Sequence, residues 1–364
     1  MIQLIIFFLI LSVLVLVHEF GHYISARIFG IKVEEFGFGL PPRARELFKK
    51  WGTTFTLNWL PIGGFVKLYG EEYSEDDEMV RGEKGRFYDK PARVRAVVLV
   101  AGVIMNFLLG ILLFATVYSF VGIPEKTDRV RVEEIVKDSP AEKAGFKVGD
   151  VVKEIDFKDE KIIIKETGNM VRLVNQQAGN ELSVLVVEKN WAEKTLKVVP
   201  RKDPPAGEGA LGVVLSSIEL TKYPWWQMPF RGARVGLDEA IAWGRDIAMG
   251  LGKMVWGLVT GKGVPKDLSG PVGIYQVSGQ VIKQGFLATL QFMGVLSINL
   301  AVLNIMPLPA LDGGHVLFLG VEKIIGKKRK NRIEGYVNTA GMIFLLSMMA
   351  LITMRDLLRL FKVI

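Results

Sequence analysis

The sequence predicts a polytopic α-helical membrane protein with about four transmembrane helices, a membrane-associated β-hairpin loop and one small inserted α+β domain. Of the 364 residues, 50% are hydrophobic, and the mean hydropathy is +0.30. These values are typical of neither a disordered chain nor an ordinary soluble enzyme. Long apolar stretches alternate with segments in which short β-type patterns recur. This alternation defines the expected architecture.

Four apolar stretches are long enough to cross a bilayer, whose core of about 30 Å requires roughly 20 helical residues. The first has no basic leading segment and no small-residue cleavage site, so we expect a retained span and not a signal peptide. The expected spans are Ile2–Ala26, Ala96–Val121, Phe286–Met306 and Tyr336–Met354.

Lys and Arg gather in the connection over residues 27–50 and in the turn over residues 327–332. By the positive-inside tendency both connections are cytoplasmic, so both termini and the inserted domain are expected outside a cytoplasmic (inner) membrane. The net charge of +8 then reflects topology and anionic lipid. Nucleic acid is not an expected partner, because the basic residues flank spans and are not interleaved with stacking aromatics. The absence of cysteine excludes disulfides and thiolate metal sites.

The connection after the first span contains the predicted β-hairpin loop. Apolar residues alternate in Val33–Leu40 and Phe55–Gly70, and a tight turn is expected at Pro61, Gly63 and Gly64. The acidic run Glu71–Glu78 is expected to be a solvated loop without chemistry.

Residues 127–217 have the pattern of a small α+β domain between the second and third spans. Two short helices are expected among its strands: in the first, Ser139 and Glu142 form a capping box and Gly145 ends the helix, and the second lies between Asn169 and Gly179. The expected strands are Val130–Val136, Asp150–Phe157, Leu182–Glu188 and Lys194–Pro200. The chain thus divides into residues 1–126, 127–217 and 218–364, the last beginning with an amphipathic helix, Gly232–Gly261, expected to lie in the membrane interface.

The first span contains the sequence HEFGH, in which His18 and His22 lie four residues apart and Glu19 stands beside His18. In a helix this spacing presents both imidazoles to one ion. The H-E-x-x-H arrangement is the zincin pattern, with two nitrogen ligands and a glutamate that acts as a base without coordinating the metal. Ionisable residues inside a span are costly, so a functional site is the expected reason for them.

A third ligand is expected from NIMPLPALDGGH, residues 304–315. Pro307 and Pro309 must break the helix there, and irregular backbone at membrane depth lines a cavity or is buried in protein. Asp312 in this segment would complete a His-His-Asp site with one open position. His315 is the rival third ligand, although we favour a supporting role for it. Iron or cobalt would also suit such a site.

Taken together, HEFGH in a first span, the inserted domain and NIMPLPALDGGH resemble the site-2 protease family of intramembrane zinc metalloproteases, in particular the group of the bacterial regulator of sigma-E protease. LPIGGFVKLYGE and LSGPVGIYQV extend the resemblance over nearly the whole chain. The resemblance implies Zn²⁺ bound by His18, His22 and Asp312, with Glu19 as the catalytic residue. It also implies that Asn304 and the strand around Gly64, Phe65 and Val66 position the substrate. Pro307 and Pro309, in the same segment as Asn304, are expected to help position it.

Within the inserted domain, DSPAEKAGFKVGDVVKEID resembles PDZ domains, which accept an extended peptide as an added strand. A structural β-domain without a peptide ligand is the alternative.

The chain departs from its group in two ways. It has room for one such domain where two are usual, and Val103 follows Gly102 where proline is frequent, although Asn106 is retained.

The expected function is hydrolysis of peptide bonds within or near the membrane segments of single-pass proteins, as in regulated intramembrane proteolysis of anti-sigma factors or signal-peptide remnants. If Arg27 marks the cytoplasmic border, His18 lies roughly 13 Å along the helix inside it, on the cytoplasmic side. Two alternatives are a membrane-anchored zinc peptidase acting on soluble or misfolded segments, and a non-catalytic scaffold that binds peptides through the PDZ-like domain.

Overall fold

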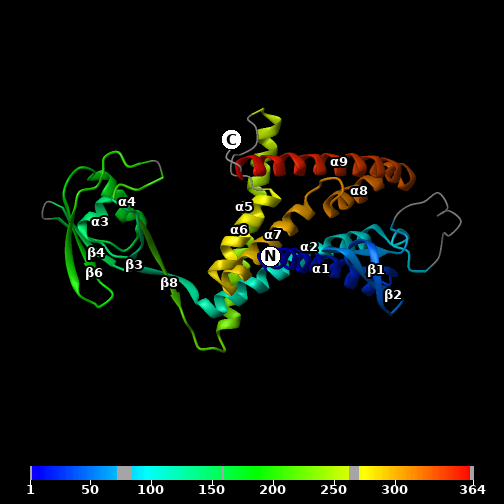
Figure 1. Cartoon of the computed structure of the whole chain (residues 1–364), viewed down its shortest axis with the longest axis horizontal. Coiled ribbons are helices and arrows are strands. Elements are labelled where there is room, and N and C mark those ends of the chain that lie inside the picture. The colour runs from blue at the N-terminus through cyan, green and yellow to red at the C-terminus, as the bar shows by residue number, and fades with distance from the viewer. Residues whose placement is uncertain (1, 72–83, 158–159, 206, 262–269, 361–364) are drawn as a thin grey trace. The chain divides into compact units, whose positions relative to one another are not determined.

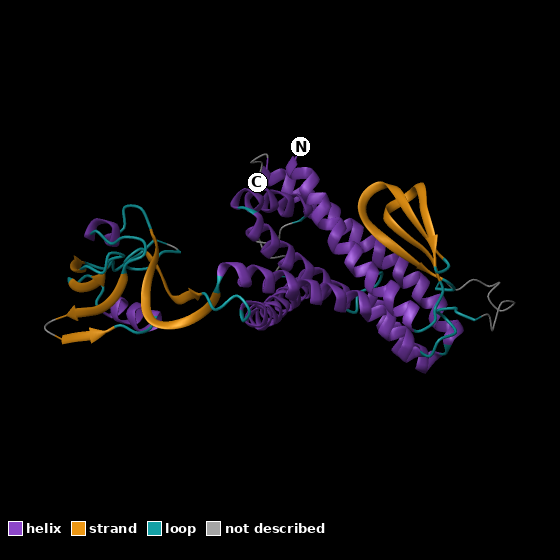
Figure 2. Cartoon of the chain, turned by 90° about the horizontal axis from the view of Figure 1, so that it is seen from below, coloured by secondary structure: helices purple, strands orange, loops and turns teal. Residues whose placement is uncertain are grey.

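A computed structural model describes residues 2–71, 84–157, 160–205, 207–261 and 270–360. The described chain forms two units, Met1–Phe120 with Pro229–Ile364, and Val121–Met228. The first unit is mainly helical and the second mainly β (Figure 2). Most of the acidic run expected at Glu71–Glu78 lies outside the described residues.

The helices described in the first unit are labelled in Figure 1. They are α1 (Ile2–Ile28), α2 (Ala92–Val121), α5 (Met228–Val259), α6 (Pro271–Gln284), α7 (Phe286–Ile305), α8 (Asp312–Ile325) and α9 (Lys327–Leu360). Among the described residues, four helices are long and apolar enough to cross a membrane, namely α1, α2, α7 and part of α9 (Arg329–Leu358). The prediction of four candidate spans is therefore confirmed, and the last helix is longer than expected.

Strands β1 (Val33–Lys50) and β2 (Thr53–Leu68) form an antiparallel sheet that lies along α1. Each long strand is bent, so that Phe36 pairs with Phe55 on one side and with Val66 on the other. Residues 61–63 therefore carry the chain past the middle of β1, between the Leu40–Leu60 and Phe38–Gly64 pairs, and do not form the tight hairpin turn that the glycines predicted. One consequence is that residues 64–68 form an outer edge of this sheet.

Helix α5 presents a small residue at every fourth position, which are Gly232, Gly236, Ala240 and Gly244. A Cβ atom at Gly236 would lie 2.8 Å from the carbonyl oxygen of Ile111 in α2. Ala240 is fully buried beside Ile298 of α7. Small residues let helix backbones approach closely, so this face of α5 packs directly on two candidate spans.

The second unit contains an antiparallel sheet in the order β7-β6-β4-β3-β8, with β5 paired to β4. Its strands are β3 (Ile123–Ile135), β4 (Val151–Phe157), β5 (Glu160–Ile163), β6 (Leu182–Val187), β7 (Glu193–Val198) and β8 (Val213–Thr221), and its helices are α3 (Pro140–Ala144) and α4 (Thr167–Gln176). A membrane protein with a β domain is thus the architecture that the structure supports.

The cap of α3 follows the sequence prediction closely. Ser139 Oγ accepts the N–H of Glu142 at 3.2 Å, and Gly145 ends the helix in the left-handed conformation. Glu142 reaches back one residue further than a standard capping box, because its carboxylate accepts the N–H of Asp138 at 2.5 Å. The buried core of this unit is formed by aliphatic side chains such as Val130, Ile155 and Leu182.

Candidate metal centre

His18 and His22 lie one turn apart on α1, and both are buried. The two imidazole rings stand edge to face with centroids 4.8 Å apart, and their Nε2 atoms are 3.2 Å apart. The helical spacing predicted from the sequence therefore brings both rings to one place.

Asp312 reaches the same place from the far end of the chain. Helix α7 ends at Ile305, and α8 begins at Asp312, so the break predicted at Pro307 and Pro309 is present. A Cβ atom at Gly313 would lie 2.3 Å from the carbonyl oxygens of Ile305 and Met306. The glycine allows the first turn of α8 to fold tightly against the end of α7, and this fold directs Asp312 toward α1.

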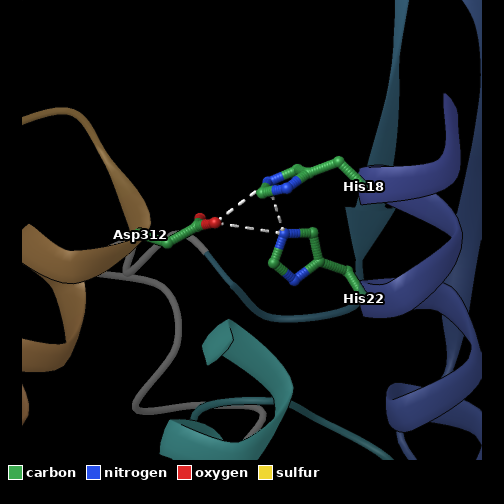
Figure 3. Close-up of side chains that lie close together, drawn as sticks. All are labelled: His18, His22 and Asp312. Atoms are coloured by element: carbon green, nitrogen blue, oxygen red, sulfur yellow. Dashed lines mark hydrogen bonds and ion pairs between the residues drawn. The ribbon is translucent and has the colours of Figure 1, made fainter. Parts of the chain in front are cut away.

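The three side chains converge as Figure 3 shows. Asp312 Oδ2 lies 3.0 Å from His18 Nε2 and 3.4 Å from His22 Nε2, and one ligand atom from each residue lies within 4.8 Å of the others. Oδ2 is buried and has no hydrogen-bond partner among the described residues, although both imidazole Nε2 atoms lie near it. Two imidazole nitrogens and a carboxylate oxygen are ligands that Zn²⁺ prefers. The donor set and the buried oxygen therefore fit a zinc ion.

Helix α2 orients these rings, which the sequence did not reveal. His22 Nδ1 lies 2.8 Å from the carbonyl oxygen of Val98, and this hydrogen bond leaves Nε2 free to face Asp312. A Cβ atom at Gly102 would lie 2.5 Å from His22 Nε2 and 2.8 Å from His18 Cε1. The absence of a side chain at Gly102 is thus what lets α2 pass beside both imidazoles.

Glu19 lies beside the cluster and contacts the edge strand of the β1–β2 sheet. Its carboxylate accepts the backbone N–H of Val66 at 3.0 Å. Gly64 brings the strand close to α1, since a Cβ atom there would lie 2.7 Å from a methyl group of Leu16. Phe65 stands between these residues, paired with Gly37 of β1. The predicted catalytic residue and the predicted substrate strand are therefore neighbours.

The remaining predicted residues lie in the segment before Asp312. Asn304 is near the end of α7, and its Nδ2 lies 3.4 Å from His18 Nε2. Pro309 packs on α9, where Gly341 leaves room for its ring. Pro307 lies in the linking segment between α7 and α8.

His315 stands one turn after Asp312 but outside the cluster of potential ligands. Its Nδ1 lies 3.0 Å from Oε1 of Glu334 on α9. The hydrogen bond to this carboxylate raises the pKa of His315 above its usual value. Glu334 also forms an ion pair with Lys330. This geometry matches the supporting role favoured for His315.

A buried ion pair connects α2 to α8, the helix that carries Asp312. Arg95 donates two hydrogen bonds to Glu322, at 2.9 and 2.6 Å, and Arg95 is almost fully buried. The sequence did not predict this contact, because Arg93 and Arg95 both stand at the start of the apolar span and nothing local distinguishes the one that is buried.

Comparison with known proteins places the chain in a family. Residues 6–348 match the profile of Peptidase family M50. The chain belongs to peptidase family M50, the site-2 protease family. Membership of this family makes the chain a membrane zinc metalloprotease.

Several relatives of this M50 peptidase match over almost their full lengths. A protein of Clostridium acetobutylicum, whose name assigns it provisionally to the zinc metalloproteases, is 32% identical over 345 residues, which cover 95% of this chain and 94% of that protein. A similarly named protein of Clostridium perfringens is 33% identical, covering 95% and 96%. The zinc metalloprotease RasP of Oceanobacillus iheyensis is 29% identical, covering 98% of both chains.

Proposed function

We propose that this M50 peptidase hydrolyses peptide bonds within or near the membrane segments of single-pass proteins. In this proposal His18, His22 and Asp312 hold Zn²⁺, and Glu19 transfers protons. The observation that carries it is the position of the cluster, because His18 lies within the apolar helix α1, ten residues before its end at Ile28. Roughly 15 Å of helix therefore separates the site from that end.

When bound, Zn²⁺ acidifies a water molecule and polarises the carbonyl of the substrate. Glu19 takes a proton from the attacking water and delivers it to the departing amine. The Val66 N–H holds the Glu19 carboxylate in place for this transfer. The Asn304 amide donates a hydrogen bond to the oxygen of the scissile carbonyl as negative charge develops there, which fits its position 3.4 Å from His18 Nε2.

The substrate must be extended before attack, because a helix hides its carbonyl groups in hydrogen bonds. Residues 64–68 offer an outer edge to which an extended segment can pair. The N–H and C=O of one strand residue point the same way, so the carbonyl of Val66 faces the side on which Glu19 lies. Pairing at this edge would place the substrate backbone beside the proton carrier.

The main test uses the full-length protein in detergent, with zinc content and cleavage measured together. Glu19→Gln should retain zinc and lose cleavage of a single-pass test substrate, whereas His18→Ala should lose both. Glu46→Gln changes an exposed carboxylate on β1 and should behave like the wild type. Equal cleavage by wild type and Glu19→Gln would overturn the proposed chemistry.

A second assay separates the membrane substrate from the alternative of soluble or misfolded segments. The same scissile sequence is supplied either inside a membrane span or as a soluble peptide. Preferential cleavage of the membrane-embedded form supports the proposal. Preferential cleavage of the soluble form would favour the membrane-anchored peptidase that acts outside the bilayer.

The edge-strand step can be tested without background labelling, because the chain contains no cysteine. In the Glu19→Gln protein, Phe65→Cys should form a disulfide with a cysteine placed at the scissile position of the substrate. Trp59→Cys, an exposed control in the same strand, should not. Equal cross-linking at both positions would exclude selective pairing at residues 64–68.

The same edge can be disrupted by Val66→Pro, which should lower turnover without loss of zinc. Proline also removes the N–H that Glu19 accepts, so the cross-link is what separates a loss of strand pairing from a loss of Glu19 anchoring. Unchanged turnover would count against both the pairing and the anchoring of Glu19.

We further propose that both termini and the second unit are extracytoplasmic and that the metal centre opens toward the cytoplasm, following the basic residues of the connections. The second unit is proposed to be PDZ-like and to admit a peptide along β8. This strand is the last in its sheet, and it contacts α4.

The proposed orientation can be tested by labelling the second unit. A membrane-impermeant thiol reagent should label Trp191→Cys, at an exposed position of this unit, in intact cells. Labelling only after lysis would reverse the proposed orientation.

A further inference from the structure

Helix α2 contributes no residue to the cluster of potential ligands, yet three of its residues in successive turns contact the two histidines. The contacts come from Val98, Gly102 and Asn106, spaced four residues apart. Residues at this spacing share one face of a helix. That face of α2 is therefore the surface against which the imidazoles rest.

The two histidines differ in how this face holds them. His22 has a short hydrogen bond from Nδ1 to the carbonyl oxygen of Val98. For His18, a hydrogen-bonding group near Nδ1 in the described part of the chain is the Asn106 amide, whose Nδ2 lies at 3.4 Å. Asn106 is fully buried, and its Oδ1 has no hydrogen-bond partner among the described residues. A buried carbonyl oxygen without a donor is costly, so this one requires an explanation.

Metal coordination supplies that explanation. A neutral imidazole that binds a metal through Nε2 carries its proton on Nδ1, and this N–H needs an acceptor. A half-turn of the Asn106 amide exchanges Oδ1 and Nδ2, because the two ends of the group have nearly the same shape. The oxygen that lacks a donor then meets the N–H that lacks an acceptor.

We propose that Asn106 is a positioning residue of the metal centre, whose side-chain oxygen accepts the Nδ1–H of His18. The hydrogen bond fixes the tautomer and the orientation of the ring, so that Nε2 faces Asp312 and the ion. This inference rests on the proposed assignment of His18 as a ligand. Asn106 and the Val98 carbonyl then act in the same way on the two histidines, although one is a side chain and the other is backbone.

The test measures zinc affinity of the full-length protein in detergent by competition with a chelator of known affinity. Asn106→Leu keeps the approximate volume and removes the acceptor, so the zinc dissociation constant should rise by about 10- to 100-fold. Asn106→Asp keeps an acceptor and should stay within a few-fold of the wild type. Ser297→Ala removes a different contact to the same residue, the hydrogen bond to its backbone oxygen at 2.7 Å, and should leave zinc affinity unchanged.

The variants distinguish the failure of this inference from the failure of the proposed metal site. Wild-type zinc affinity in His18→Ala would overturn the ligand assignment itself. If His18→Ala loses zinc but Asn106→Leu keeps wild-type zinc affinity, the assignment of the metal site holds and the positioning role of Asn106 is overturned. Equal weakening by Asn106→Leu and Asn106→Asp would show that the amide acts as a donor or through packing, which also contradicts the proposal.

A spectroscopic measurement covers the case in which Asn106→Leu does not fold. The chain has three histidines, so nitrogen-15 spectra of histidine-labelled protein contain few signals. In the zinc-loaded wild type, His18 should be the Nδ1–H tautomer with its proton hydrogen-bonded. In Asn106→Ala that proton should shift to the position of a weaker hydrogen bond. An identical proton shift in both proteins would refute the proposed acceptor.

Discussion

Replacing Gly102 with alanine should remove zinc from the protein while making α2 intrinsically more helical. The new Cβ atom would lie 2.5 Å from His22 Nε2, and ordinary van der Waals contact begins near 3.4 Å, so the ring must move by roughly 0.9 Å. Metal–ligand distances tolerate only about 0.2 Å. The hydrogen bond from His22 Nδ1 to Val98 opposes any rotation that would relieve the contact. We therefore expect His22 to be lost as an effective ligand.

The expected loss of zinc affinity is at least about 100-fold, which corresponds to about 2.8 kcal/mol. Helix propensity changes in the opposite direction, since alanine is favoured over glycine by about 1 kcal/mol inside a helix. The assay is chelator competition with purified protein, combined with thermal unfolding of the metal-free form. Gly320→Ala is the matched control, because a Cβ atom at this helical position of α8 meets nothing within 4 Å. Wild-type zinc affinity in Gly102→Ala would refute the placement of α2 against the imidazoles.

Three further predictions concern α8. Gly313→Ala should lower the zinc stoichiometry measured by atomic absorption, because the new Cβ would lie 2.3 Å from two backbone carbonyl oxygens. Retained stoichiometry would contradict the tight fold of this turn. Arg95→Met should lower the free energy of unfolding by about 3–5 kcal/mol, because it leaves the Glu322 carboxylate unpaired. Adding Glu322→Leu should recover most of this loss, measured by thermal unfolding. No recovery would argue against a pairing effect. The raised pKa of His315 means that its pair with Glu334 stabilises the fold fully below the ordinary histidine pKa of about 6.5, and that this contribution is lost as pH rises through the raised value. Glu334→Gln should move the His315 titration in NMR spectra toward lower pH, and an unmoved titration would exclude the pair as the cause.

The parts of the structure that the sequence predicted are those with a strong local or compositional signal. Twenty apolar residues in a row have few structural solutions, so the candidate spans were recognisable without long-range information. The spacing of His18 and His22 follows from helix geometry alone, and Pro307 marks a break that any helix must show. These local rules were sufficient to select Asp312, although it lies almost 300 residues after His18.

The parts that the sequence did not predict depend on contacts without a side-chain signature. The pairing of Phe36 with both Phe55 and Val66 is a long-range choice of register, which alternation in each strand does not specify. The Val98 contact to His22 uses a backbone carbonyl, which every residue has. Four small residues along α5 were visible, but a sequence does not show which helices they meet.

Helix α2 shows how a span can be both apolar and chemically specific. It is the most hydrophobic of the four candidate spans, so each polar residue buried in it requires a reason. Arg95 pairs with the helix that carries Asp312, Gly102 makes room for the imidazoles, and Asn106 lies beside His18. These three residues therefore face the metal centre or the helix that supplies its carboxylate. The cost of placing polar groups in this span is explained by the organisation of a site to which the span itself gives no ligand.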